Sequence, residues 1–311
     1  MSNPYINGWL VEREKADFER FFGSSQTVGN ANVLSTAEAV TMIENAAKSP
    51  IATHPWQMAE RLFESNLTPY RRLTVWNQDA NNCAGHATTR AVDAFAMIRC
   101  WLGDRYELSP FESFVPWVWG VGKNEAGQTG TGGATIGAML AMIAQHGVLP
   151  SDTPGLPPYA GTSNQWAKHY GKQAKNAPYS PFWDIAQKYR VTVAPLPQDA
   201  ELFALACKAG FSIAFGTSQR IAQTQNADCK TQNECRIWKT SGSWMHAMAA
   251  YGYDADRNVV GIDNSHGDGF AWADRDVLNL VVNRARYFDA FVILDMQPRA
   301  GNPDWHLIGQ S

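Results

Sequence analysis

The sequence NQDANNCAGHATTRAVDAFAMIRCWL, residues 77–102, decides the fold of this chain. Apolar side chains recur in it at steps of three and four residues, which is the spacing of one helix face. They are Ala87, Ala91, Ala94, Phe95, Ile98 and Trp101. The pattern predicts a long, largely buried helix over residues 83–102, with Cys83 at its N-terminal end.

A thiol at a helix N-terminus is favoured in its thiolate form by the positive end of the helix dipole. A neighbouring imidazole would go further and form an ion pair, in which the thiolate is the resting nucleophile. On its own, Cys83 is more typical of a buried, inert thiol. The chemical interpretation therefore depends on a base, a group that orients the base, and an oxyanion donor elsewhere in the chain.

The base, the orienting group and the oxyanion donor each have a candidate. His246 lies at the start of an apolar strand, in SWMHAMAAYGYD, and Asn264 ends the next strand, in VVGIDNSHG. Two adjacent antiparallel strands of this length bring the two side chains together. Gln78 lies five residues before the cysteine, on the loop that leads into the helix, where its amide would face an oxyanion.

Together these motifs resemble the papain-like cysteine peptidases. NQ at 77–78 and NCAGHA at 82–87 are similar to that family's oxyanion glutamine and nucleophilic cysteine. The strand of His246 ends in GYD, as in the family's histidine motif, and DNSHG at 263–267 is similar to its Asn-Ser-Trp-Gly turn. GTGGA at 130–134 resembles the stretch that carries the family's substrate-backbone glycines. The motifs occur in the family's order.

This resemblance implies a thiol peptidase that hydrolyses peptide bonds. Cys83 would attack the scissile carbonyl, and His246 would act as its base and then protonate the leaving amine. Asn264 would hold the imidazole in the useful tautomer. Gln78 and the backbone N–H of the cysteine would bind the oxyanion.

The glycines Gly132 and Gly133 have two interpretations. In the family's manner they would pair with an extended peptide backbone. Alternatively, they form a tight turn before the helix that the apolar pattern predicts over residues 134–145.

Three features depart from the family pattern. The loop from Gln78 to Cys83 is one residue short, Ala84 replaces an aromatic residue, and His266 replaces the tryptophan that covers the His–Asn bond. Without this tryptophan we expect the bond to be wetter and to orient the base less firmly. A catalytically weak or inactive structural or assembly protein with the papain fold, for example a bacteriophage virion component, is therefore an alternative. A third is a thiol acyl-transfer enzyme, such as a transglutaminase or a cell-wall amide hydrolase.

Other residues near these motifs have an ordinary structural interpretation. His86, one turn after the cysteine, either tunes the thiolate or fills a contact on the helix face. His266 covers the base, acts as a second base, or is a surface turn residue. Trp117 and Trp119 are more typical of a core than of a ligand platform.

In the second half of the chain the hydrophobic period changes from that of helices to that of strands. Strands are expected over residues 190–195, 211–217, 245–254, 259–264 and 288–296, with one helix over 200–208. A helical lobe followed by an antiparallel β lobe makes an α+β protein, and the resemblance implies the papain-like two-lobe form. We expect a papain-like domain over 76–311, with a helical lobe over 76–178 and a β lobe over 179–311.

Residues 1–75 precede the motifs and carry no catalytic pattern. Ser35-Thr-Ala-Glu38 is a capping box that opens a helix ending near residue 48. A second helical run is expected over 55–65. This helical extension is interpreted as a propeptide, as an arm that contacts other subunits, or as an added structural layer.

Composition and charge narrow the class of partner. The 311 residues are 45% hydrophobic and 18% charged, with a formal net charge of −3 and no Lys/Arg cluster. We therefore expect a polypeptide substrate or a protein partner, and no nucleic acid. No stretch is long and apolar enough for a membrane span, and the N-terminus lacks a secretory-signal pattern. We expect a cytoplasmic protein, or one incorporated into a virion or another assembly.

The five cysteines show no disulfide-scaffold spacing. Cys100 and Cys207 lie in apolar helical patterns and are expected to be small buried side chains. Cys229 and Cys235 flank a short polar loop and would bridge in an oxidising setting. Their neighbourhood lacks metal-ligand spacing, so we expect no metal ion and no cofactor.

Overall fold

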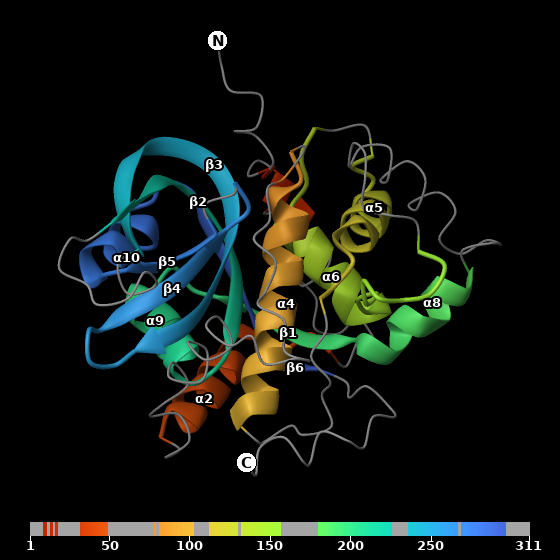
Figure 1. The fold of residues 1–311 in the computed structure, drawn as a ribbon, viewed down its shortest axis with the longest axis horizontal. Helices are drawn as coiled ribbons and strands as arrows, with labels where there is room; N and C mark the ends of the chain where they lie inside the picture. The colour runs from red at the N-terminus through yellow and green to blue at the C-terminus, as the bar shows by residue number, and fades with distance from the viewer. Residues whose placement is uncertain are drawn as a thin grey trace.

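Helix α4, Cys83–Leu102, runs between a β-sheet and a group of helices (Figure 1). The computed structural model describes residues 9–10, 13–14, 16–17, 32–48, 78, 81–102, 112–129, 132–156, 180–225, 236–266 and 269–296. Helix α4 begins and ends at the residues that the hydrophobic spacing predicts. From Cys83 to Ile98 its apolar side chains, including Ala91 and Phe95, are buried in the main hydrophobic core.

A six-stranded sheet lies beside α4, with the strand order β1-β6-β2-β3-β4-β5 and antiparallel neighbours. The strands are β1 (Val191–Leu196), β2 (Ser212–Gln225), β3 (Arg236–Asp254), β4 (Val259–Asn264), β5 (Gly269–Ala273) and β6 (Phe288–Met296). The chain thus combines helices with an antiparallel sheet, which confirms the predicted α+β class and the papain-like arrangement of helical and β regions.

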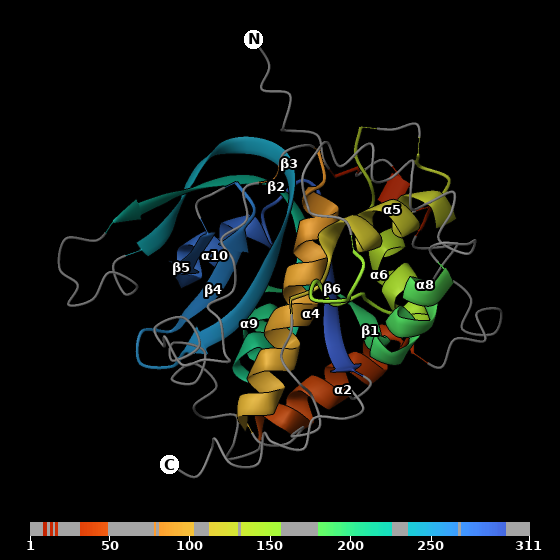
Figure 2. The ribbon, with the colours of Figure 1, turned by 45° about the vertical axis from the view of Figure 1, so that its right-hand side comes forward.

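Strands β2 and β3 are longer than the sequence predicts. Strand β2 pairs with β6 only from Ser212 to Thr217, and beyond that point it continues with β3 as a ribbon (Figure 2). In this ribbon β3 also pairs with β5, where Ile237 lies opposite Trp272. The pairing slips once between Thr217 and Gln219 and again between Arg220 and Ile221. The ribbon is rich in polar residues, so it lacks the alternation that marks a half-buried strand.

The remaining helices pack on two sides of this framework (Figure 1). Helices α5 (Val115–Glu125), α6 (Ile136–His146) and α8 (Ser180–Ala186) lie across α4 from the sheet, and a 3₁₀ turn (Gln187–Tyr189) follows α8. Helices α9 (Ala200–Lys208) and α10 (Arg275–Val281) pack against β2 and β3. The sequence patterns predicted α6 and α9, whereas α5, α8, α10 and β5 were not predicted. None of the helices that the described residues form is long and apolar enough to cross a membrane.

Helix α6 ends at His146, and Gly147 is its C-cap. This residue has φ of 82°, in the left-handed region that favours glycine. A Cβ there would lie 1.8 Å from the carbonyl oxygen of Ala186, so the end of α6 can only carry a glycine.

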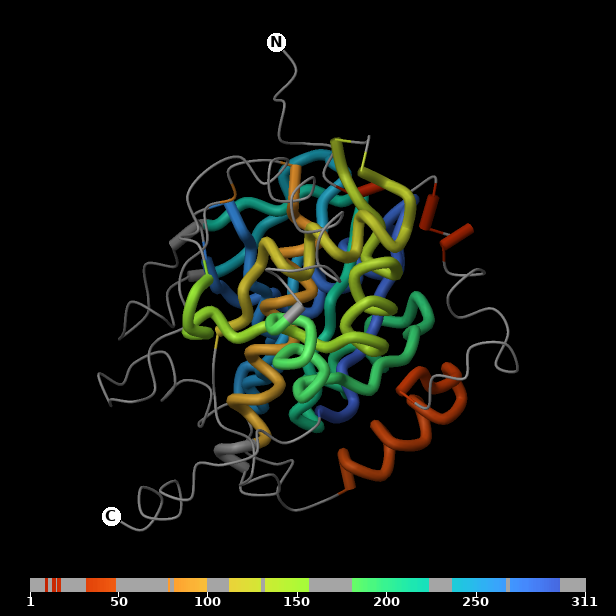
Figure 3. The backbone as a smooth tube through the Cα atoms, turned by 90° about the vertical axis from the view of Figure 1, so that its right-hand side faces the viewer, coloured from red at the N-terminus to blue at the C-terminus, as the bar shows by residue number. Residues whose placement is uncertain are grey.

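Part of the N-terminal region is described, and it packs on the rest of the chain. Helix α2, Thr36–Ala47, begins with the predicted capping box, in which Ser35 and Glu38 bond reciprocally. It lies at the edge of the molecule, next to β1 and α9 (Figure 3). The run over 55–65 and the pair Cys229 and Cys235 lie outside the described residues. The domain boundary at residue 75 stays a prediction.

Candidate active site

Cys83 is the first residue of α4, and its side chain is 0% exposed. The backbone N–H groups of Ala247, Ala84 and Cys83 itself bond to the sulfur. These bonds act to lower the pKa of the thiol, but burial has the larger effect and raises that pKa to about 12. The sulfur of Cys83, the candidate nucleophile, therefore faces Ala247 in strand β3, the residue directly after His246.

His246 and Asn264 meet as the strand pairing predicts. Strands β3 and β4 are antiparallel, with Ala249 opposite Asp263. His246 Nε2 lies 2.8 Å from Asn264 Oδ1, and both side chains are buried. Because an amide oxygen only accepts, Nε2 carries the proton and Nδ1 is the basic nitrogen of the neutral ring. Within the described part of the chain, Nδ1 has no hydrogen-bond partner.

The imidazole of His246 is held in its neutral form. Burial lowers its pKa to about 3, the neighbouring His266 and His86 act in the same direction, and the bond to Asn264 opposes them. Since burial also raises the pKa of the Cys83 thiol, this closed arrangement favours a neutral thiol and a neutral imidazole. It differs from the resting ion pair that helix position and a nearby imidazole predict.

Two aromatic rings cover His246. The ring centroids of Trp244 and His266 lie 4.5 Å and 4.2 Å from that of His246. The expectation of a wetter His–Asn bond is therefore wrong, because His246 and Asn264 are 0% and 1% exposed. His266 is half-buried against the imidazole and is not a free surface turn residue. Trp244 was not predicted, although its position two residues before His246 places both on one face of β3.

Gln78 joins this cluster through the residue that follows Asn264. Its backbone N–H donates to the carbonyl of Ser265 at 2.7 Å, and its Oε1 accepts from the Ser265 hydroxyl at 2.6 Å. The side chain is buried, and its oxygen is held by the serine, which fixes the orientation of the amide nitrogen.

A buried ion pair connects α4 to β4 one residue before Asn264. Arg90 Nε lies 3.0 Å from Asp263 Oδ2, with side chains 4% and 7% exposed, and the Tyr251 hydroxyl donates to the same oxygen at 2.6 Å. The pair fixes the nucleophile helix relative to the strand that orients the base. It was not predicted. The signal in the sequence is a charged residue within a largely apolar helix, at helical spacing from His86 and Asp93.

His86 lies one turn after Cys83 and is buried, as the interpretation of a helix-face contact predicts. Burial lowers its pKa to about 3, with Arg90 and His266 acting in the same direction. Trp117 and Trp119 are fully buried in α5 and belong to the core.

The two glycines lie between the nucleophile loop and α6. Gly132 is exposed, and a Cβ on it would lie 3.4 Å from the side-chain nitrogen of Asn81, two residues before Cys83. Gly133 is buried. An exposed backbone segment therefore lies beside the entrance to α4.

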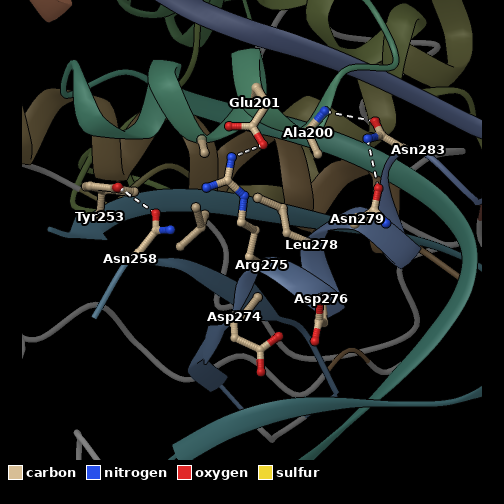
Figure 4. Close-up of a pocket in the computed structure, with 13 residues that line it drawn as sticks. Ala200, Glu201, Tyr253, Asn258, Asp274, Arg275, Asp276, Leu278, Asn279 and Asn283 are labelled. Carbon is tan, nitrogen blue, oxygen red and sulfur yellow. Dashed lines mark hydrogen bonds and ion pairs between the residues drawn. The ribbon is translucent and has the colours of Figure 1, made fainter. Parts of the chain in front are cut away.

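A separate pocket of about 220 Å³ lies at the other end of the β3–β4 pair (Figure 4). The Tyr253 hydroxyl donates there to Asn258 Oδ1 at 2.8 Å, and Arg275 pairs with Glu201. Tyr253 is seven residues from His246 along β3, or about 20 Å. Within the described ranges, no three His, Cys, Asp or Glu side chains converge to hold a metal ion.

The comparisons with known proteins find similarity in fold. No protein-family model matches the sequence, and the search of curated proteins finds no significant match. Among solved structures, xylellain, a cysteine protease from Xylella fastidiosa, is 20% identical, with 71% of this chain and 82% of that chain covered and a TM-score of 0.46.

Two further solved structures are 12% identical to this chain. Procathepsin B S9 from Trypanosoma congolense has a TM-score of 0.46, with 74% of this chain and 73% of that one covered. Digestive procathepsin L 3 of the Tenebrio molitor larval midgut has a TM-score of 0.43, with 91% and 87% covered. The TM-scores of all three structures lie below 0.5. At these identities the likeness concerns the fold alone.

Proposed function

We propose that this chain is a papain-like thiol peptidase that hydrolyses peptide bonds with Cys83, His246 and Asn264. The observation that carries the proposal is the hydrogen bond between His246 Nε2 and Asn264 Oδ1. This bond leaves Nδ1 of His246 as the basic nitrogen. The next residue in β3, Ala247, bonds through its backbone N–H to the sulfur of Cys83. A thiol, a base and an orienting amide are the groups that acyl transfer to sulfur requires.

In the first half of the reaction, the sulfur of Cys83 bonds to the scissile carbonyl carbon. The thiol proton passes to His246 Nδ1 as this bond forms, because a neutral pair is the resting state. The oxyanion receives hydrogen bonds from the Cys83 N–H and from the side-chain amide of Gln78. When the C–N bond breaks, the imidazolium gives its proton to the leaving amine, and a thioester remains.

In the second half, water attacks the thioester with His246 as the base. The C–S bond breaks, the proton returns to sulfur, and the peptide acid leaves. Gly132 and Gly133 offer backbone groups to an extended substrate. Since Cys83 and His246 are both buried, substrate reaches them only when the segments around them move aside.

An epoxysuccinyl probe tests the proposal, because it reacts only with an activated thiol in such a site. We expect labelling of the wild-type protein at neutral pH, located at Cys83 by mass spectrometry and lost in Cys83→Ala together with peptide hydrolysis. Cys207→Ala is the matched control, since it removes another buried free cysteine and should leave both signals intact. A folded wild-type protein that neither reacts nor hydrolyses peptides would refute the proposal.

A second candidate function is a structural or assembly protein that uses this fold without catalysis. The observation that favours it is the complete burial of both Cys83 and His246. On this alternative, Cys83→Ala leaves assembly unchanged, and the protein is present in stoichiometric amounts in a particle. Loss of function in Cys83→Ala would exclude it.

A further inference from the structure

Three side chains of the N-terminal region, Trp9, Glu14 and Asp17, are buried against the rest of the chain. We call them the N-terminal clamp. Trp9 donates to Glu14, and the other hydrogen-bond partners of Glu14 and Asp17 lie in residues 128–137, more than a hundred positions away in the sequence. The clamp therefore connects the start of the chain to the segment that contains the two glycines of the proposed site.

Glu14 binds the N-terminus of α6. Its carboxylate accepts from the backbone N–H of Ile136 at 2.9 Å and of Gly137 at 2.6 Å, and the indole of Trp9 donates to it at 2.8 Å. The first N–H groups of a helix have no partner within the helix, so the side-chain oxygens of Glu14 satisfy two of them. Glu14 thus fixes the first turn of α6.

Asp17 and Leu10 fix the residues between the glycines and α6. Asp17 Oδ2 accepts from the Thr135 hydroxyl at 2.7 Å and from the side-chain amide of Gln128. The N–H of Leu10 donates to the carbonyl of Ala134 at 3.0 Å. The four residues that directly follow the glycines are therefore all bonded to the N-terminal region.

Trp9 also reaches the sheet beside the candidate nucleophile. Its indole packs against Gly216 in β2, where a Cβ would lie 2.5 Å from the ring. Gly216 is paired with Ala247 in β3, whose N–H bonds to the sulfur of Cys83. The clamp therefore fixes the position of Gly132 and Gly133 relative to strands β2 and β3.

We propose that the N-terminal clamp positions Gly132 and Gly133 for substrate, and that it stays part of the working protein instead of being removed as a leader. The inference rests on the proposed function. Gly132 is exposed and has no side chain to fix its backbone, so its position depends on how the residues after it are held. Glu14 is a positioning residue, because its bonds are to Trp9, Ile136 and Gly137 and not to a reacting group.

The test is Glu14→Ala in the full-length protein. For a fluorogenic peptide, we expect KM to rise about tenfold because the binding segment is misplaced. Alkylation of Cys83 by iodoacetamide needs no backbone pairing, so its rate should stay within about twofold of wild type. Hydrogen exchange at the amides of Ile136 and Gly137 should be at least about tenfold faster, because both lose their acceptor.

Glu38→Ala is the matched control, since it removes a carboxylate from the N-terminus of α2, away from the glycines. It should change neither KM nor exchange at residues 136–137. Glu14→Gln, which keeps one acceptor oxygen, should lie between wild type and Glu14→Ala. An unchanged KM in Glu14→Ala, or full activity after residues 9–17 are cleaved off, overturns the inference. Unchanged hydrogen exchange at residues 136–137 overturns the inference whether or not the wild type hydrolyses peptides. Absence of peptide hydrolysis by the wild type refutes only the proposed function.

Discussion

Strands β3 and β4 run side by side, and their two ends treat polar side chains differently. At one end His246 and Asn264 are buried beneath two aromatic rings. At the other end Tyr253 and Asn258 bond to each other at the border of a pocket (Figure 4). Nearby, Arg257 pairs with Asp254 near the surface. The contrast teaches that water is excluded from His246 and Asn264, which keeps the imidazole of His246 neutral.

The largest difference between the two ends should appear when an Asp–Arg pair is broken at each. Asp263→Ala removes the buried partner of Arg90, and we expect the free energy of unfolding to fall by about 3–5 kcal/mol. Asp254→Ala breaks the more exposed pair with Arg257 and should cost about 1 kcal/mol or less. Urea denaturation at neutral pH measures both.

The stability of a double variant distinguishes two causes of the loss in Asp263→Ala: a buried Arg90 left without its ion-pair partner, and poorer packing around position 263. The double variant Arg90→Met/Asp263→Leu removes both charges of this pair, and stability should recover part of the loss seen in Asp263→Ala. Equal costs for Asp263→Ala and Asp254→Ala would contradict the contrast between the two ends.

The next effect is on the pH dependence of stability. Burial holds the pKa of His86 at about 3 in the folded protein, below the 6.5 of an unperturbed imidazole. Between pH 3 and pH 6.5, His86 binds a proton in the unfolded chain but not in the folded protein. Its contribution to the free energy of unfolding is therefore complete above pH 6.5 and is lost as the pH falls towards 3. The stability difference between wild type and His86→Asn should rise with pH in this window, by at most about 1.4 kcal/mol per unit, and be flat above it. Parallel pH curves for the two proteins would contradict the prediction.

The smallest effect concerns the ring that covers the proposed base. His266→Ala should lower kcat/KM about threefold, because the His246–Asn264 bond becomes wetter. It should also move the acid limb of the pH–rate profile to higher pH, because the charge of His266 helps to lower the pKa of His246. His266→Trp should restore the rate but keep the shifted limb. An acid limb that stays in place in both variants would show that His266 has no influence on the base.

The elements that carry the site could be predicted from local patterns. Helix α4 and strands β4 and β6 have clear periodicity, and their observed bounds agree with the predicted ones. Helix α5 was missed because nine consecutive residues, Val115 to Lys123, are buried. A helix that is buried on all sides has no amphipathic period to reveal it.

The contacts that complete the site could not be predicted, because they join residues far apart in the sequence. The pattern around Asn264 suggested its meeting with His246, only 18 residues earlier. In contrast, Glu14 and Ile136 are 122 residues apart, and a carboxylate that caps a distant helix leaves no local signal. The expectation of a wet base failed for a related reason. The sequence after Asn264 shows the missing tryptophan, but not the ring that Trp244 supplies from the neighbouring strand.

The close approach of Trp9 to Gly216 has a consequence for mutational scanning. An alanine at position 216 has no room beside the indole, so it would displace the tryptophan and disturb both α6 and the strand next to Ala247. An alanine scan scored only by turnover would rank this glycine with the reacting groups, although it bears no functional group and acts only by leaving space.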